Sequence, residues 1–182
     1  MFPNAVLIGE AWMKGIKFNE LKTININHKF LKWISGASSD NLLKEYIDEL
    51  DGVLDFKLQE LIRGYVVRGK LSKKEFYDKV KRHYRGYPKD YFLPTFLDNH
   101  DMDRFLYTCH DKKELLKEAI RIQFSIDQPK IIYYGTEVGM SQRKSTHEFT
   151  KHGDLRAREP MKWEKQDKEL LKFYKNIIRI NS

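Results

Sequence analysis

Two acidic side chains stand where a carboxylate could serve acid–base chemistry. Glu10 follows the apolar run of residues 5–8, and Asp101 follows a second apolar run that ends at residue 97. A carboxylate at the end of a strand is held in position by the rigid sheet, and apolar neighbours can raise its pKa toward the range for proton donation. Either acid alone would also fit an ordinary solvated loop. Together they predict a catalytic edge on a sheet.

The elements that must position these acids follow an alternating pattern. Runs rich in β-branched and aromatic residues indicate four buried strands, over residues 5–8, 52–56, 91–97 and 130–134. Helical periodicity occupies residues 42–50, 58–66, 115–124 and 170–178. A capping box from Ser72 to Glu75 opens one more helix, and the Asp-Lys-Lys-Glu sequence at residues 111–114 resembles another helix start. Because strands and helices alternate, the sequence predicts the α/β class with parallel βα units.

The length of the chain limits how many such units it holds. A closed barrel of eight βα units needs about 250 residues, whereas the chain has 182. Four units, or half a barrel, fit this length. Residues 13–37 and 141–163 are predicted to be long loops, and both follow strands. We expect the chemistry at this face, because active sites of parallel sheets are built from the loops that follow the strands.

The basic residues are concentrated in one segment. Residues 63–89 hold ten Lys or Arg against two acidic residues, which accounts for the whole net charge of +8. Aromatic side chains are interleaved with these charges, a combination found on nucleic-acid surfaces. However, Phe76, Val80 and Tyr84 recur every four residues, which is typical of the buried stripe of a helix whose other face is solvated. We therefore expect no nucleic-acid partner.

Several other classes are also disfavoured by composition. Hydrophobic residues make up 41% of the chain, but no run approaches eighteen apolar residues, so no membrane span is expected. The start has neither a basic leader nor a cleavage site, which favours a cytoplasmic protein. The single cysteine, Cys109, cannot form an internal disulfide, and no Cys/His spacing matches a zinc site.

Four motifs, in order, resemble the α-amylase family, the family 13 glycoside hydrolases. The sequence Gly-Glu-Ala-Trp at residues 9–12 matches the motif that ends the fifth barrel strand of that family, and residues 96–101 match the Phe-x-x-Asn-His-Asp motif of the seventh. Residues 133–140 match the eighth-strand motif, and residues 158–163 match a following Arg-x-Pro-Met-x-Trp. The resemblance implies that residues 1–182 form strands five to eight of a TIM-type barrel, with residues 52–56 as the sixth strand.

The resemblance also implies roles for individual residues. Glu10 would be the general acid/base, and Asp101 would be the auxiliary carboxylate that orients sugar hydroxyls and stabilises the oxocarbenium-like transition state. His100 would donate a hydrogen bond to the sugar, and Asn99 would belong to the same substrate-binding group. Trp12 would stack on a sugar ring, although packing within its own loop is equally compatible with the sequence.

Asp55 and Asp98 are expected to be structural, with Asp98 supporting the site from behind. Arg158 is expected to brace the loops of the last unit rather than to touch the reacting bond.

Parts of the family pattern are not found in this sequence. The family's nucleophile lies in a Gly-x-Arg-x-Asp motif on the fourth strand, and no such motif occurs here. The family's calcium site lies mostly in the first half of the barrel, so no metal and no cofactor is expected in this chain. We also expect no C-terminal β-sandwich domain in this chain. We expect a partner to cover the half-barrel: a complementary N-terminal half, a second copy of the chain, or the rest of a longer protein.

The expected activity is that of a retaining hydrolase of α-glucans or maltooligosaccharides, inactive without the first half of the barrel. Two alternatives remain open from the sequence. The same intermediate could be attacked by a sugar hydroxyl, which would make the protein an α-glucan transglycosylase. The chain could also be a non-catalytic glycan-binding or interaction protein with the same fold, although the presence of Glu10, His100 and Asp101 argues against that reading.

Overall fold

The computed structural model describes residues 5–10, 44, 46–147 and 154–181. The chain segments that were predicted as strands lie side by side in sequence order, all parallel. Strand β1 (Ile8–Gly9) pairs with β2 (Gly52–Val53). Parallel bridges then join Gly52 to Phe92 and Thr95 to Lys130. The predicted order of parallel segments is therefore confirmed for the described residues.

The strands are shorter than predicted. The first two predicted strands are each reduced to two residues, and β1 (Ile8–Gly9) ends one residue beyond the predicted range of 5–8. Residues 91–97 and 130–134 form single bridges instead of strands. Pro94 and Pro129 contribute to this difference, because proline has no N–H for a ladder. Their carbonyl groups still accept hydrogen bonds, from Asp55 N at 3.0 Å and from Thr95 N at 2.8 Å.

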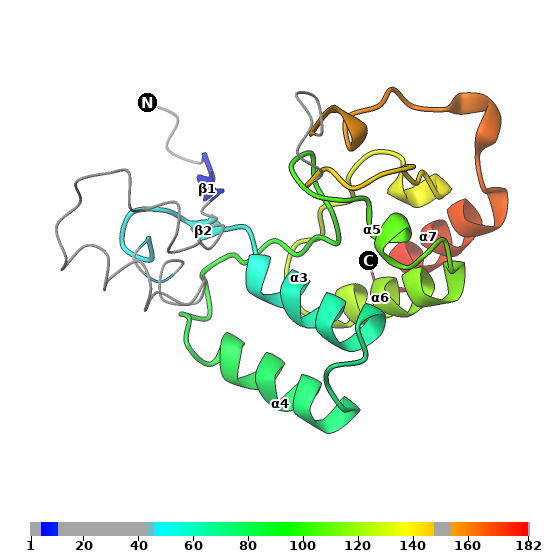
Figure 1. Ribbon diagram of the computed structural model, residues 1–182. Helices are drawn as coiled ribbons and strands as arrows, with labels where there is room; N and C mark the ends of the chain where they lie inside the picture. Colours follow the sequence, from blue (N-terminus) through cyan, green and yellow to red (C-terminus); the bar gives the residue numbers. More distant parts are fainter. Residues whose placement is uncertain (1–4, 11–43, 45, 148–153, 182) are drawn as a thin grey trace, which may run out of the picture.

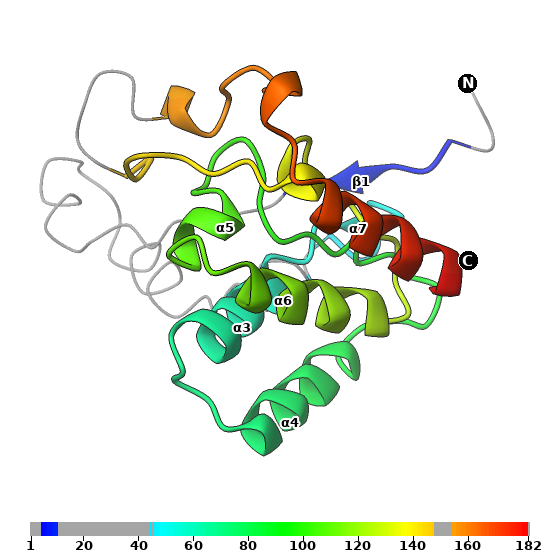
Figure 2. The ribbon, with the colours of Figure 1, turned by 90° about the vertical axis from the view of Figure 1, so that its right-hand side faces the viewer.

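Helices follow the parallel segments and cover one side of them (Figures 1 and 2). The described helices are α3 (Phe56–Ile62), η2 (Arg63–Val67, a π-helical turn), α4 (Lys73–Tyr84), α5 (Phe105–Thr108), α6 (Lys113–Ser125), η3 (Thr136–Val138), η4 (Asp154–Arg156), η5 (Trp163–Lys165) and α7 (Lys168–Asn181). Helix α3 contacts α4, η2 contacts α6, and α6 contacts α7. In both views α3 lies between α4 and α6.

The first residues of the helices can be compared with the helix-start signals in the sequence. The capping box is confirmed, since Glu75 N donates to Ser72 Oγ at 3.3 Å and Ser72 N donates to Glu75 Oε2 at 2.8 Å. The helix start predicted within residues 111–114 is confirmed, since α6 begins at Lys113, but its N-cap is Lys112 and not Asp111, which has a left-handed φ of 58°. Of the helix predicted over residues 42–50, Lys44 is helical and residues 46–49 form a turn, while residues 42, 43 and 45 lie outside the described residues.

The main core lies between the helices and the parallel segments. Phe76 and Val80 are buried in it, and Tyr84 packs against it. The helical interpretation of this stripe is confirmed, because its apolar side chains face the core while most basic neighbours on α4 are exposed. Cys109 is fully buried in the same core, and burial raises the pKa of its thiol to about 12. The thiol is therefore protonated at neutral pH.

The opposite face of the parallel segments carries exposed apolar side chains. Ile8, Gly52 and Phe92 are in register, so their side chains share one face. Ile8 and Phe92 are each 39% exposed there, whereas Val53 on the alternate face is fully buried. A Cβ at Gly52 would lie 2.3 Å from the Phe92 carbonyl oxygen, so only glycine fits between the neighbouring segments. Ile131, which is 41% exposed, extends the apolar face.

Among the described residues, no helix combines the length and the apolar character needed to cross a lipid bilayer.

Candidate active site

The carboxyl ends of two parallel segments bring the sequence-predicted acids together. Glu10 directly follows β1, and residues 99–101 follow the third segment. One oxygen of Glu10, one ring nitrogen of His100 and one oxygen of Asp101 all lie within 4.8 Å of one another. Asn99 Nδ2 also donates a hydrogen bond to Glu10 Oε1 at 3.3 Å. Four of the five candidate residues therefore form one cluster, called here the strand-end cluster (Glu10, Asn99, His100, Asp101). Trp12 lies outside the described residues.

The turn at residues 99–101 is held by contacts within itself. Asp101 N donates to Asn99 Oδ1 at 2.9 Å, so the Asn99 side chain shapes the backbone and also reaches Glu10 through its amide nitrogen. His100 Nε2 lies 3.2 Å from Asp101 Oδ2. Both His100 and Asp101 remain about two-fifths exposed, so a ligand can reach them.

Arg158 contacts the cluster directly. Its Nη2 donates to Asp101 Oδ1 at 2.6 Å, and its Nε donates to the His100 carbonyl oxygen at 3.2 Å. The prediction that Arg158 braces loops holds in part, since it ties the last loop to the turn at residues 99–101. The sequence did not indicate that it pairs with Asp101. The Asp101 carboxylate thus lies between the Arg158 guanidinium on Oδ1 and the His100 imidazole on Oδ2.

Asp98 supports the turn from the interior, as predicted. Its two oxygens accept hydrogen bonds from Phe105 N at 2.7 Å and from Thr136 Oγ1 at 2.8 Å. Burial raises the pKa of this carboxyl. Thr136 is presented by η3, which is bracketed by Gly135 and Gly139 at φ values of 87° and 75°. Those left-handed positions explain the two glycines in the motif at residues 133–140.

A second acid near the turn fastens the following loop. Asp103 Oδ1 accepts hydrogen bonds from Gln142 Nε2 at 2.7 Å and from Thr146 N at 2.6 Å, and Oδ2 accepts one from Ser145 Oγ at 2.8 Å. Burial opposes ionisation of Asp103, but these hydrogen bonds outweigh it and hold its pKa below the ordinary value. Sequence reasoning missed this contact, because the partners lie about forty residues away and carry no local signal.

Arg104 anchors the motif at residues 133–140 to the same region. The side chain is only 1% exposed, and its guanidinium lies 4.3 Å from the Tyr133 ring centroid and 4.7 Å from that of Tyr134. It also donates to the Tyr134 carbonyl oxygen. Cation–π contacts are strongest where water is excluded. The two tyrosines of the motif therefore hold a buried cation next to the site.

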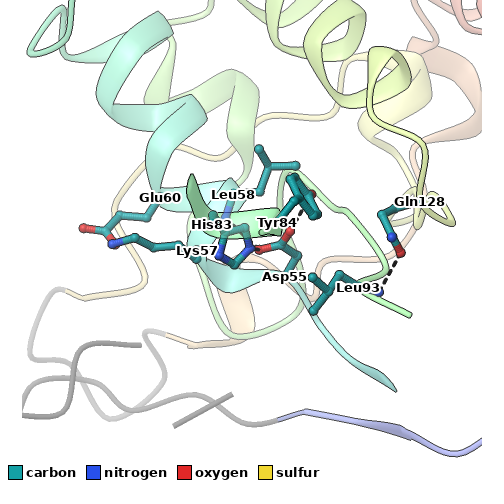
Figure 3. Close-up of polar contacts among 8 residues, drawn as sticks. All are labelled: Asp55, Lys57, Leu58, Glu60, His83, Tyr84, Leu93 and Gln128. Atoms are coloured by element: carbon teal, nitrogen blue, oxygen red, sulfur yellow. Dashed lines mark hydrogen bonds and ion pairs between the residues drawn. The ribbon is translucent and has the colours of Figure 1, made fainter. Parts of the chain in front are cut away.

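Asp55 forms a separate, buried cluster (Figure 3). Its Oδ1 lies 2.9 Å from His83 Nε2 and accepts a hydrogen bond from Leu58 N at 2.8 Å, while Tyr84 Oη donates to Oδ2 at 2.6 Å. Asp55 and His83 are 0% and 3% exposed. The prediction that Asp55 is structural fits these contacts, which join the end of β2 to α3 and α4. We call this group the buried cluster (Asp55, His83, Tyr84).

The strand-end cluster also has the donor types of a metal site. Two carboxylates and one imidazole within 4.8 Å could hold a divalent cation. A cation there would compete with Arg158, whose guanidinium already neutralises Asp101 at 2.6 Å. Because the three groups are also exposed to solvent, the arrangement fits a site that contacts a hydroxylated ligand better than a closed metal site.

The sequence of the chain is similar to that of a known protein family. The alpha-amylase catalytic-domain pattern matches residues 34–180. Alpha-amylase 2 of Dictyoglomus thermophilum is 40% identical over 139 residues, which cover 75% of this chain and 25% of that protein. The chain thus spans about a quarter of the length of the curated relatives it matches.

Solved structures agree at the level of fold. A cyclomaltodextrinase matches 74% of this chain and 22% of its own, with a TM-score of 0.65 and 27% identity. An alpha-amylase from Geobacillus thermoleovorans, complexed with acarbose, matches 97% of this chain and 33% of its own, with a TM-score of 0.61 and 23% identity. The matched fold is part of an amylase barrel. Because the family pattern covers most of the chain and a relative of 40% identity spans three quarters of it, the chain belongs to the alpha-amylase family and carries part of its catalytic domain.

Proposed function

We propose that the chain supplies the general acid/base and the transition-state-stabilising carboxylate of a retaining α-glucan hydrolase. The observation that supports this most strongly is the approach of Glu10, His100 and Asp101 to within 4.8 Å, from segments about ninety residues apart in sequence. Acarbose bound to the Geobacillus alpha-amylase supports an α-glucan as the substrate class.

In the proposed reaction, the Glu10 carboxyl group donates its proton to the glycosidic oxygen as that oxygen leaves the anomeric carbon, and a nucleophilic carboxylate bonds to the same carbon. Water then attacks the anomeric carbon and displaces that carboxylate, while the Glu10 carboxylate takes a proton from the water. Asp101 accepts hydrogen bonds from sugar hydroxyls and offsets the positive charge that develops on the ring. His100 donates a hydrogen bond to the same sugar, and Arg158 positions Asp101. No cofactor in this chain is required.

A retaining enzyme also needs a nucleophilic carboxylate about 5–5.5 Å from the acid. Asp101 is assigned the auxiliary role here, and its two oxygens contact Arg158 and His100. The Gly-x-Arg-x-Asp motif that carries the nucleophile in the family does not occur in this sequence. We therefore assign the nucleophile to the upstream βα units of the family barrel, which this chain does not include.

The exposed apolar face supports the same assignment. Ile8, Phe92 and Ile131 would face the interior of a closed barrel, where upstream units would cover them. We infer that this chain forms the C-terminal half of the barrel. The first half would be supplied by the preceding part of a longer chain or by a complementary polypeptide. A second copy of this chain would cover the apolar face but would not add the nucleophile.

The test is to complete the barrel with the matching upstream half and to measure reducing ends released from maltoheptaose. We expect no turnover by the chain alone and turnover by the mixture. Glu10→Gln should lower the rate about 100- to 10,000-fold, as expected for loss of a general acid. Glu49→Gln, at an exposed glutamate away from the cluster, is the matched control and should leave the rate unchanged. Efficient turnover by the isolated chain, or normal activity of Glu10→Gln, would contradict the proposal.

A further inference from the structure

Two neighbouring tyrosines contact the backbone on either side of Arg158. Tyr133 Oη donates a hydrogen bond to the Ala157 carbonyl oxygen at 3.3 Å, and Tyr134 Oη donates one to the Glu159 carbonyl oxygen at 2.8 Å. We call these two residues the tyrosine pair (Tyr133, Tyr134). Its hydroxyl groups hold the loop at both neighbours of a single residue, which is the arginine that contacts the strand-end cluster.

The rings of the tyrosine pair are fixed from the interior of the protein. Both lie against the guanidinium of Arg104, a side chain that is only 1% exposed. The two rings also contact each other, with centroids 4.6 Å apart. Phenylalanine rings would keep these contacts, because the cation interacts with the face of the ring and not with the hydroxyl group. The hydrogen bonds to the loop can therefore be removed separately from the packing of the rings.

The pairing of Arg158 with Asp101 depends on where this loop lies. Both side chains are 43% exposed, and an exposed ion pair contributes little by itself, because water screens the charges and both side chains must be ordered. Arg158 nevertheless makes two contacts at once, to Asp101 Oδ1 and to the His100 carbonyl oxygen. Such a two-point contact needs one orientation of the planar guanidinium, which costs less when the backbone that carries it is already held in place.

Arg104 connects the tyrosine pair to the turn that carries Asp101. It follows Asp101 by three residues in the sequence, and its guanidinium also donates to the Tyr134 carbonyl oxygen. The contacts thus form a closed path from the turn through Arg104, the tyrosine pair and the loop to Arg158, and from Arg158 back to the turn.

We propose that the tyrosine pair positions Arg158, and through it the carboxylate of Asp101, by holding the loop carbonyl groups on either side of Arg158. This inference rests on the proposed function, since it concerns how Asp101 is held for the reaction. Neither tyrosine needs to contact the substrate. The loss of the two hydroxyl groups would therefore affect the transition state more than the binding of the ground state.

The first test measures kcat and KM of the completed barrel for maltoheptaose. The double variant Tyr133→Phe/Tyr134→Phe should lower kcat about three- to tenfold, in the range for lost hydrogen bonds, with little change in KM. Tyr134→Phe alone, at a side chain that is 39% exposed, should show a smaller loss and keeps the test valid if the double variant does not fold. Tyr77→Phe is the matched control, because Tyr77 is an exposed tyrosine on α4, and it should leave both constants unchanged.

Combination with Arg158→Gln separates positioning from a general loss of stability. If the tyrosine pair acts through Arg158, removal of its hydroxyl groups from Arg158→Gln should lower kcat by less than about twofold, whereas independent effects would multiply. Multiplied losses would overturn the inference, and so would an unchanged kcat or a rise in KM alone in the double tyrosine variant.

The second test does not depend on turnover. Nuclear magnetic resonance of the full chain measures how fast the Arg158 Nε–H proton exchanges with solvent, and Arg158→Gln identifies its signal. The double tyrosine variant should exchange this proton at least about threefold faster, because the contact to the His100 carbonyl oxygen opens more often. Tyr77→Phe and Glu10→Gln should leave the rate unchanged.

An unchanged rate in the double tyrosine variant, or a wild-type rate as fast as in an unfolded peptide, would overturn the inference. A completed barrel without turnover would instead contradict the proposed function, and the exchange rates would still decide whether the tyrosine pair holds Arg158.

Discussion

Two Asp–His pairs in the described part of the chain differ in their surroundings. In the strand-end cluster, His100 and Asp101 lie 3.2 Å apart and are each about two-fifths exposed. In the buried cluster, His83 and Asp55 lie 2.9 Å apart, with side chains that are 1% and 0% exposed. Buried polar groups must have their partners in place, whereas exposed ones can exchange protein contacts for ligand contacts. The difference teaches that burial, rather than residue type, separates the structural pair from the proposed catalytic one.

The largest expected effect is loss of the buried pair. Asp55→Ala removes the acceptor shared by His83, Tyr84 and Leu58 N, and leaves those polar groups buried without it. We expect the free energy of unfolding to fall by about 3–5 kcal/mol, as when one partner of a buried pair is removed. Urea unfolding followed by circular dichroism measures this change. A loss below about 1 kcal/mol would mean that the buried cluster is not structural.

The opposite result is expected for the exposed pair. Asp101→Asn should lower the turnover of maltoheptaose by the completed barrel about 100- to 1,000-fold, because a carboxylate stabilises the transition state far better than an amide. The free energy of unfolding should change by less than about 0.5 kcal/mol, as for most exposed positions. Activity and urea unfolding, measured on the same variant, check both parts. Near-normal activity would remove Asp101 from the proposed mechanism.

The pH dependence of the free energy of unfolding tests the buried cluster further, through the hydroxyl group of Tyr84. Burial, followed by the charge of Asp55 and their hydrogen bond, raises the pKa of Tyr84 well above its ordinary value of 10.0. The unfolded chain therefore loses this proton first, so the stabilisation is complete below about pH 10 and declines as pH rises further, by at most about 1.4 kcal/mol per pH unit. Urea unfolding at pH 9 and pH 11 should show a smaller decline for Tyr84→Phe than for the wild-type chain.

Tyr84→Phe should itself cost about 1–2 kcal/mol at neutral pH, since it removes one hydrogen bond to a buried carboxylate. Tyr77→Phe, at an exposed position on the same helix, is the control. An identical alkaline decline in all three proteins would show that Tyr84 does not titrate as its contacts with Asp55 indicate.

The smallest effect is expected for Arg158. Arg158→Gln removes the contacts to Asp101 and to the His100 carbonyl oxygen, and should lower kcat of the completed barrel about tenfold with little change in KM, because it positions a group that acts in the transition state. Arg158→Lys keeps the positive charge but loses the two-point contact. Its kcat should therefore lie between that of the wild-type protein and that of Arg158→Gln. Arg121→Gln on α6 is the control. A rise in KM alone would assign Arg158 to substrate binding instead.

Local sequence signals predicted the parts of the fold that depend on neighbouring residues. The capping box at Ser72 and the stripe of Phe76 and Val80 gave α4 correctly. The strand-end motifs placed Glu10 and Asp101 at one edge, because the carboxyl ends of parallel segments meet there. Strand lengths were overestimated, since ladder formation depends on neighbouring segments and on the prolines within them.

Contacts between distant segments were not predictable. The ion pair between Arg158 and Asp101 spans 57 residues, and Asp103 reaches its loop partners across about forty. The contact between His83 and Asp55 required knowing that α4 lies against the end of β2. Such partners are set by tertiary packing, and one sequence without aligned relatives carries no signal for them.

The buried thiol has a practical consequence. Cys109 is the only cysteine of the chain, and it lies fully inside the core at the end of α5. A thiol-specific reagent can therefore react only while the interior is transiently open, so its rate of labelling reports how often that happens. The labelling rate of Cys109 therefore measures whether an added half-barrel, or a bound oligosaccharide, makes opening of the helical layer less frequent.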